Sequence, residues 1–192
     1  MSKTKIAILA ALFVVLAVLV IIFFTGGEGE SLKHLSETPP TKLQPSETTP
    51  VGPRTVTLFF LSEDDALFHP EEREIPAGPS VADEIERTVT ELIKGSDKDL
   101  IAPLPAETEV RQAFVTKEGV AYVDFTKAIV DAFTYGSSSE IAAIYAVVNT
   151  VAFNFKPVKK VCILVEGTEK ETLGGHIDLS WPFVPQFSLI AR

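Results

Sequence analysis

The fold of this protein is decided by residues 137–182, which read SSSEIAAIYAVVNTVAFNFKPVKKVCILVEGTEKETLGGHIDLSWP. Apolar residues recur in its first half at the spacing of one helical face: Ile141, Ile144, Tyr145, Val148, Val151, Ala152 and Phe155. The hydroxyl groups at residues 137–139 are candidate N-caps of this helix, and Pro157 prevents the helix from continuing. The short apolar run at residues 161–165 predicts a buried strand against which the helix packs.

The run ETLGGHIDL at residues 171–179 closes this segment. Only glycine adopts a positive φ without steric cost, so Gly174 and Gly175 predict a turn with at least one positive φ. We expect the chain around this turn to form a final hairpin or a turn.

Two extended segments and a helix precede the deciding segment. The side chains of residues 54–61 alternate between two faces, which predicts a strand, and residues 67–75 predict a second extended piece interrupted by Pro70. Ser80 and Asp83 resemble a capping pair at the start of a helix. This helix has an apolar stripe and a glycine stop: Val81, Ile85, Val89, Leu92, Ile93 and Gly95.

A β-hairpin is predicted between the two helices. Residues 110–116 and 120–125 read as strands and flank Lys117-Glu118-Gly119, a turn that contains glycine. Apolar residues after the hairpin indicate a short helical turn: Ile129, Val130 and Phe133. The order of elements predicts an α+β fold, a two-layer sandwich of a mostly antiparallel sheet with two main helices.

The N-terminal region predicts a membrane anchor. Residues 6–24 contain no charge, proline or glycine, and as a helix they would extend roughly 28 Å, about the hydrocarbon thickness of a bilayer. Lysines at residues 1–5 precede this run, and Glu28 and Glu30 follow it, which predicts a short cytoplasmic N-terminus. We therefore expect a single-pass signal-anchor protein of the cytoplasmic (inner) membrane, with its C-terminal domain outside the cytoplasm.

A cleaved signal peptide is the alternative for this region, although its apolar part usually has only about 7–15 residues. Thr25 and Gly27 are small residues of the kind that a cleavage site contains. A lipid-anchored lipoprotein would need a cysteine just after the apolar run, and the sequence has none there.

Residues 25–53 predict a linker rich in proline, serine and threonine. Such a composition cannot bury enough apolar surface to become ordered, so the segment is expected to act as a tether. It would span about 30 Å as a coil and about 90 Å in polyproline form. The extracytoplasmic domain is then residues 54–192, and the linker either gives it reach or is a passive spacer.

Composition excludes several classes of function. From residue 55 onward the chain has 12 Lys and Arg against 22 Asp and Glu, and this negative field would repel a nucleic acid. Cys162 is the only cysteine, so neither an intrachain disulfide nor a cysteine-based zinc site can form. His34, His69 and His176 lie far apart in the sequence, without the close ligand pair of a metal site. The sequence therefore predicts no metal and no cofactor.

His176 and Asp178 are the candidate catalytic residues. They are two apart, so on a strand they would point to the same face, and a nearby serine would complete a hydrolytic triad. No glycine-flanked nucleophile elbow accompanies them, and the serines at residues 137–139 are better explained as a helix start. Asp124 is either a buried acid or a cap of the next turn. We predict that the protein is not an enzyme, with an envelope hydrolase acting through His176, Asp178 or Asp124 as the alternative.

Several segments resemble, in their order and spacing, the sporulation/germination-type GerMN domain family. They are Gly136-Ser137, IYAVVNT at residues 144–150, VKKV at residues 158–161, LVEG at residues 164–167 and ETLGGHIDL at residues 171–179. The resemblance covers about residues 54–182. Its most specific part contains Leu173, Gly174, Gly175, His176 and Asp178.

The resemblance implies an extracytoplasmic α+β domain of a bacterial lipoprotein or membrane-anchored protein, in a family not known for catalysis. Some members are assembly or scaffold components of the spore envelope. Here a single copy follows a transmembrane segment, whereas spore-forming members often have two tandem copies and a lipidation cysteine, so the role in spores is not carried over. We expect a tethered, non-catalytic binding or assembly domain of the cell envelope. Its expected partner is a protein, a cell-wall component or a second copy in a homo-oligomer, and the family motif is expected to be a structural turn.

Overall fold

The computed structural model describes residues 52–131 and 136–192. The chain divides into two units, residues 1–47 and 48–192, and every described residue belongs to the second. The predicted membrane segment, almost all of the predicted linker, and Phe133 of the predicted helical turn lie outside the described residues. Within the described ranges, no helix combines the length and the apolar character that crossing a membrane requires.

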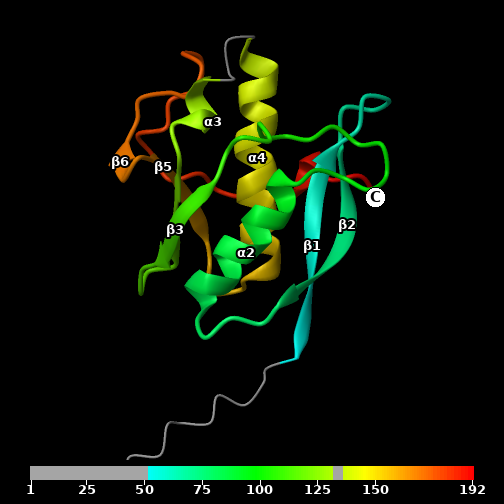
Figure 1. The fold of residues 1–192 in the computed structure, drawn as a ribbon. Helices are drawn as coiled ribbons and strands as arrows, with labels where there is room; N and C mark the ends of the chain where they lie inside the picture. The colour runs from blue at the N-terminus through cyan, green and yellow to red at the C-terminus, as the bar shows by residue number, and fades with distance from the viewer. Residues whose placement is uncertain (1–51, 132–135) are drawn as a thin grey trace, which may run out of the picture. The chain divides into compact units, whose positions relative to one another are not determined.

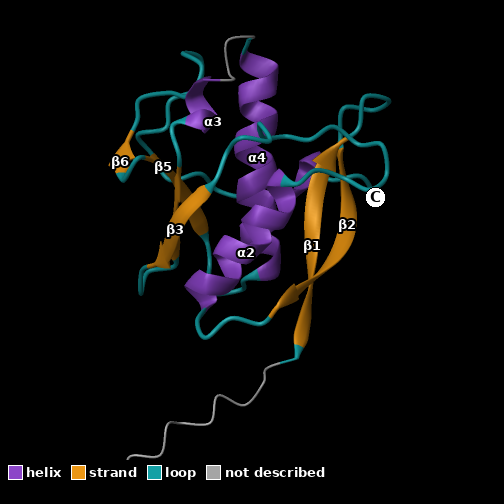
Figure 2. Ribbon diagram, viewed as in Figure 1, coloured by secondary structure: helices purple, strands orange, loops and turns teal. Residues whose placement is uncertain are grey.

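The first sheet is an antiparallel pair of β1 (Pro53–Leu61) and β2 (Phe68–Pro76) (Figures 1 and 2). Both predicted extended segments are thus confirmed as strands. Pro70, however, does not interrupt the second one, because it lies within β2 opposite Phe59. A two-stranded sheet has only edge strands, and an edge strand accommodates proline because one of its sides needs no ladder partner.

The second sheet has the strand order β3-β4-β5-β6. Its strands are β3 (Val110–Val115), β4 (Val120–Phe125), β5 (Lys160–Val165) and β6 (Thr168–Glu169). The predicted hairpin is confirmed as the antiparallel pair β3 and β4, but β4 and β5 run parallel. The expectation of one mostly antiparallel sheet is therefore corrected to two sheets among the described residues, one of them mixed. A parallel pair requires a long crossover, and here a helix supplies it.

The helix α2 (Val81–Ile93) begins and ends as the sequence predicts. The side chain of Ser80 accepts a hydrogen bond from the backbone N–H of Asp83, which confirms the capping pair. Gly95, just beyond the helix, has a φ of 87°, the left-handed geometry of a helix-ending glycine. The apolar stripe is buried except for its first residue, Val81, which is exposed.

The central helix α4 (Ser137–Asn154) lies between the two sheets (Figure 1). It contacts β1 of the first sheet and β5 of the second, and α2 likewise contacts both sheets. The predicted two-layer sandwich is corrected accordingly, since the two main helices are enclosed by sheets on both sides. For the same reason α4 buries residues around most of its circumference, although Ile141 of the predicted apolar face is exposed.

The start of α4 also differs from the prediction. Gly136 is the N-cap, with a φ of 93°, and no side chain caps the helix there. The serines at residues 137–139 lie within the first turn, where the hydroxyl of Ser139 donates a hydrogen bond to the carbonyl of Gly136. A glycine takes this extended positive-φ geometry without strain, so the chain begins the helix one residue earlier than the serines suggest.

Side chains of α4 complete the first sheet. The amide of Asn154 imitates a neighbouring strand, because its Oδ1 accepts from Thr57 N at 2.8 Å and its Nδ2 donates to Thr57 O at 2.7 Å. Thr150 Oγ1 accepts from Phe59 N at 3.2 Å. A two-stranded ribbon is marginally stable alone, so these bonds hold β1 against the core.

Two short helical elements and a long C-terminal segment complete the domain. They are α3 (Ala128–Asp131), which confirms part of the predicted helical turn, and the 3-10 helix η1 (Phe187–Leu189). The C-terminal segment passes from the second sheet to the first (Figure 1): Phe183 bridges to Val161 of β5, and Ile190 bridges to Phe68 of β2.

Candidate functional site

Residues 173–179, which we call the motif loop, are held by one buried side chain. Glu140 lies in the first turn of α4, and none of its surface is exposed. Its Oε1 accepts a hydrogen bond from Leu173 N at 3.0 Å, and its Oε2 accepts one from His176 N at 3.1 Å. The helix thus anchors the loop through a carboxylate that contacts the backbone on both sides of the two glycines.

Two opposing effects act on the pKa of Glu140. Burial raises this pKa, while hydrogen bonds from backbone N–H groups of the motif loop lower it. The net direction is a pKa below the ordinary value of 4.5. The carboxylate is therefore ionised at neutral pH, with its charge compensated by the backbone N–H groups that surround it.

The motif loop is a turn closed on itself. Gly175 has a φ of 91°, which confirms the predicted positive φ, and its N–H donates to Thr172 Oγ1 at 3.0 Å. Leu179 N donates to Glu171 O at 2.8 Å and closes the base of the loop. Leu173 and Leu179 are buried, so the loop is fixed by apolar packing at its ends as well as by Glu140.

His176 and Asp178 do not form a catalytic pair. His176 Nδ1 lies 3.3 Å from Glu140 Oε2, whereas Asp178 Oδ1 accepts from Ser180 N at 2.9 Å. The hydrogen bonds from Ser180 lower the pKa of Asp178, which is an exposed anion. The expectation that the two side chains share a face depended on a strand, and the loop has a turn instead.

Asp124 is the buried acid among the candidates. It lies on β4 and is 5% exposed. Its Oδ1 accepts from Gly167 N at 2.8 Å, and its Oδ2 accepts from Arg111 Nη1 at 2.9 Å. Both oxygens are thus engaged in fixing the turn after β5 and the neighbouring strand β3.

The segment of residues 181–187, which we call the C-terminal ridge, exposes large apolar side chains. Trp181 is 73% exposed, Val184 56% and Phe187 47%. The ring of Phe187 makes an edge contact with Phe153 of α4, itself 51% exposed, at a centroid distance of 6.2 Å. Exposed apolar groups gathered in this way are typical of a surface that contacts another molecule.

Buried polar groups hold the C-terminal ridge in place. Asn149 of α4 is fully buried, and its side chain both accepts from Gln186 N at 2.8 Å and donates to Gln186 O at 3.2 Å. Phe183 and Val161 exchange backbone hydrogen bonds of 2.8 and 2.9 Å. The exposed rings therefore stand on a fixed backbone, which lowers the entropic cost of binding through them.

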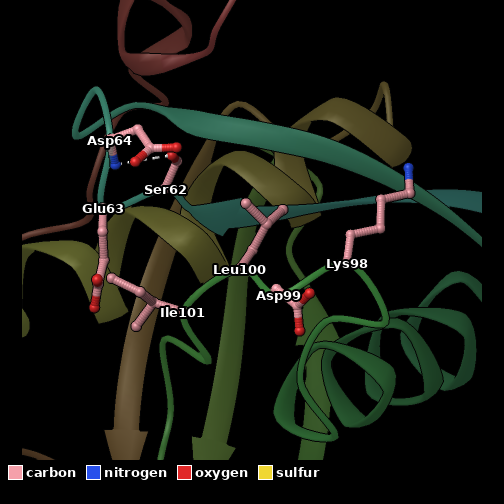
Figure 3. Close-up of a pocket in the computed structure, with 7 residues that line it drawn as sticks. All are labelled: Ser62, Glu63, Asp64, Lys98, Asp99, Leu100 and Ile101. Atoms are coloured by element: carbon pink, nitrogen blue, oxygen red, sulfur yellow. Dashed lines mark hydrogen bonds between the residues drawn. The ribbon is translucent and has the colours of Figure 1, made fainter.

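An open depression of about 670 Å³ lies at the far end of β1 (Figure 3). Its lining comes from the loop between β1 and β2 and from the loop after α2: Ser62, Glu63, Asp64, Lys98, Asp99, Leu100 and Ile101. Three carboxylates and one ammonium group give it an acidic character. Within the described ranges, no three His, Cys, Asp or Glu side chains gather so as to hold a metal ion.

Reasoning from the sequence missed both Glu140 and the C-terminal ridge. Glu140 is the only charged residue of α4, and a lone acid in an apolar helix is a signal of a buried anchor. The ridge had a weaker signal, since Trp181, Val184 and Phe187 alternate with prolines in a segment without helical or strand periodicity.

The features above define an α+β domain whose C-terminal loop is anchored on a central helix. The family described as "Germane: Sporulation and spore germination" matches residues 57–171. The chain belongs to this family, the GerMN (Germane) domain family, and carries one copy of the domain. The predicted resemblance is thereby confirmed.

Solved structures with a similar fold include two proteins. One is described as "2.5 Angstrom Crystal Structure of Putative Lipoprotein from Clostridium perfringens", with 23% identity, a TM-score of 0.51 and coverage of 73% of this chain and 95% of that chain. The other is the tandem GerMN domains of the sporulation protein GerM from Bacillus subtilis, with 20% identity, a TM-score of 0.55 and coverage of 69% of this chain and 46% of that chain. At these identities the likeness shows the fold alone. A search of curated proteins finds no match.

Proposed function

We propose that this protein is a membrane-tethered, extracytoplasmic binding or assembly domain of the bacterial cell envelope and does not catalyse a reaction. The observation that carries the proposal is the C-terminal ridge. Trp181 is the most exposed large apolar residue described, yet two residues further on Phe183 exchanges backbone hydrogen bonds with Val161 of β5, and the buried amide of Asn149 holds Gln186. Tryptophan on a rigid support is typical of the residues that dominate binding energy at interfaces.

The arrangement of the motif loop supports a role without catalysis. The carboxylate of Glu140 accepts hydrogen bonds from the backbone and is enclosed, so it has no access to a substrate. His176 lies against that carboxylate, and the family is not known for catalysis. A hydrolase acting through His176 and Asp178 is the alternative, and it would need these two side chains to meet.

The location outside the cytoplasm is supported by two observations. The uncharged run at residues 6–24, with lysines before it and acids after it, favours a single-pass anchor whose N-terminus is cytoplasmic. The similar structure from Clostridium perfringens is described as a lipoprotein, and lipid anchoring likewise holds a protein at a membrane.

Photo-crosslinking in cells tests the proposed binding surface. A photoreactive amino acid replaces Trp181 in the full-length protein, and the control replaces Phe114, an exposed aromatic residue of β3 that stacks on Tyr122. We expect discrete adducts from position 181 and none from position 114. The absence of adducts at position 181, or equal adducts at both positions, would contradict binding through the ridge.

A further inference from the structure

We propose that four lysines at one end of the domain bind the anionic headgroups of the membrane surface and hold the domain against it. These residues, which we call the lysine end, are Lys117, Lys156, Lys159 and Lys160. The inference rests on the membrane tether of the proposed function. It adds a second contact, between the folded domain and the lipid surface.

Two loops that are distant in the sequence form the lysine end. The turn between β3 and β4 contains Lys117, the loop from α4 to β5 contains Lys156 and Lys159, and Lys160 is the first residue of β5. Gly119 O accepts from Lys159 N at 2.7 Å and from Lys160 N at 3.3 Å. A Cβ at Gly119 would lie 2.5 Å from Pro157 O, so the two loops touch closely and bring the four lysines to one end of the domain.

The lysine end contrasts with the charge of the rest of the domain. All four lysines are exposed, and the lysine ion pairs found among the described residues involve Lys94 and Lys127 instead. Glu118 lies among the four lysines, and Glu84 lies at the same end, where it forms an ion pair with Arg54 beside Asn154. Apart from the four lysines and Glu118, residues 55–192 contain 8 Lys and Arg against 21 Asp and Glu. Positive charge is therefore concentrated at this end of the domain, where Arg54 compensates the charge of Glu84, as in a surface that binds anions.

The chain enters the domain beside the lysine end. β1 begins at Pro53, and Arg54 Nη2 donates to the carbonyl of Asn154, the last residue of α4, at 2.7 Å. The guanidinium of Arg54 also lies 4.6 Å from the ring centroid of Phe155, directly before Lys156. In Figure 1, the start of β1 and the turn between β3 and β4 lie toward the same end of the domain. The predicted linker therefore joins the domain at the end that carries the four lysines.

The opposite end of β1 carries the acidic loops. Glu63 and Asp64 follow β1, and Asp99 lines the same depression (Figure 3). A strand of nine residues spans about 30 Å, so the acidic end lies roughly that far from the start of the domain. An anionic surface would attract one end and repel the other, which favours one orientation of the domain.

The charge of the lysine end suffices for binding once the domain is tethered. A lysine near an anionic lipid surface is worth about 1 kcal/mol, or about fivefold in an equilibrium constant. Four lysines and one acid therefore favour the docked domain by roughly 100-fold at low salt. A tether keeps the domain at high effective concentration near the surface, so this modest preference decides its position.

Energy transfer from the full-length protein to lipid measures the docked state. A donor fluorophore is attached at Glu118→Cys, since Cys162 is buried, and acceptors are attached to lipid headgroups. The protein is reconstituted in phosphatidylcholine vesicles with or without phosphatidylglycerol. The test variant replaces the four lysines of the lysine end by Gln, and the matched control replaces Lys94, Lys98, Lys127 and Lys170 by Gln.

We expect phosphatidylglycerol to raise energy transfer for the parent and for the control, but not for the test variant. Raising salt from 0.1 M to 1 M shortens the Debye length from about 10 Å to about 3 Å and should abolish the increase. The proposal would be overturned if energy transfer in the parent were equal with and without phosphatidylglycerol. It would also be overturned if the test variant kept the increase, or if the control variant lost it. If the test variant unfolds, the salt dependence of energy transfer in the parent protein still tests whether the domain binds anionic lipid through its charge. A protein that separates from neutral vesicles in a flotation experiment would contradict the membrane tether instead. Salt-sensitive binding of that protein to anionic vesicles would still test the lysine end.

Discussion

Replacing Glu140 tests whether one carboxylate anchors the motif loop. Glu140→Ala removes the acceptor of the hydrogen bonds from Leu173 N and His176 N. Hydrogen bonds to a charged group contribute about 1.5–3 kcal/mol each, so we expect a loss of about 3–6 kcal/mol in unfolding free energy. Glu140→Gln keeps one oxygen but places an NH2 group against an N–H donor, and should cost about half as much, about 1.5–3 kcal/mol.

Urea unfolding of the detergent-solubilised full-length protein, followed by far-UV circular dichroism, measures these losses. The control is Glu107→Gln at an exposed acid, which should change the unfolding free energy by less than about 0.5 kcal/mol. In Glu140→Ala, the amides of Leu173 and His176 should also exchange with deuterium faster than in the parent. A Glu140→Ala protein as stable as the control would refute the anchoring of the loop by this carboxylate.

The pH dependence gives a second test of the same residue. The folded-state pKa of Glu140 lies below its ordinary value of 4.5, so its stabilisation is fully present above that pH and is lost as the pH falls through the folded pKa. The difference in unfolding free energy between the parent and Glu140→Gln should therefore be constant near neutrality and shrink below pH 4.5. A difference that increased in acid would contradict the assigned direction.

Four further predictions concern the turn, the sheet edge, ligands and topology. Gly175→Val and Gly175→Ala should each lower the unfolding free energy, measured in urea, by more than about 1 kcal/mol. No atom lies within 4 Å of an added Cβ, so the cost comes from the positive φ of this residue. Variants as stable as the parent would contradict this. Asn154→Ala should cost about 2 kcal/mol by losing its two bonds to Thr57, and faster exchange of the Thr57 amide would localise the effect, whereas unchanged exchange would speak against it. Chelator and reductant should leave the melting temperature unchanged, since Cys162 is the only cysteine, and a drop with chelator would reveal a metal site. Protease added to spheroplasts should degrade the domain and leave a small membrane-embedded fragment, while full protection would refute the orientation.

Local signals in the sequence predicted the elements whose ends are set by neighbouring residues. The Ser80 cap, the Gly95 stop and the glycine turn at Gly119 each depend on contacts within a few residues. A period-two pattern likewise predicted β1, and the turn that contains glycine predicted the hairpin of β3 and β4. Such features follow from backbone geometry and need no knowledge of the tertiary structure.

Features set by distant contacts could not be predicted in this way. The division into two sheets depends on Asn154 and Thr150 occupying the edge of β1, and nothing near them in the sequence shows this. The pairing of Glu140 with a loop more than thirty residues away is equally non-local. His176 and Asp178 would share a face only on a strand, and tertiary packing places a turn there instead.

Complementation of a deletion strain, with the abundance of each variant measured in parallel, tests the central claim most directly. The claim is that the domain acts by binding through the C-terminal ridge and not by catalysis through His176. We predict that Trp181→Ala accumulates normally but loses function, because this exposed side chain contributes nothing to the core. We predict that the function of His176→Ala follows its abundance. A His176→Ala protein that folds and accumulates normally yet abolishes function, with Trp181→Ala fully active, would contradict the account.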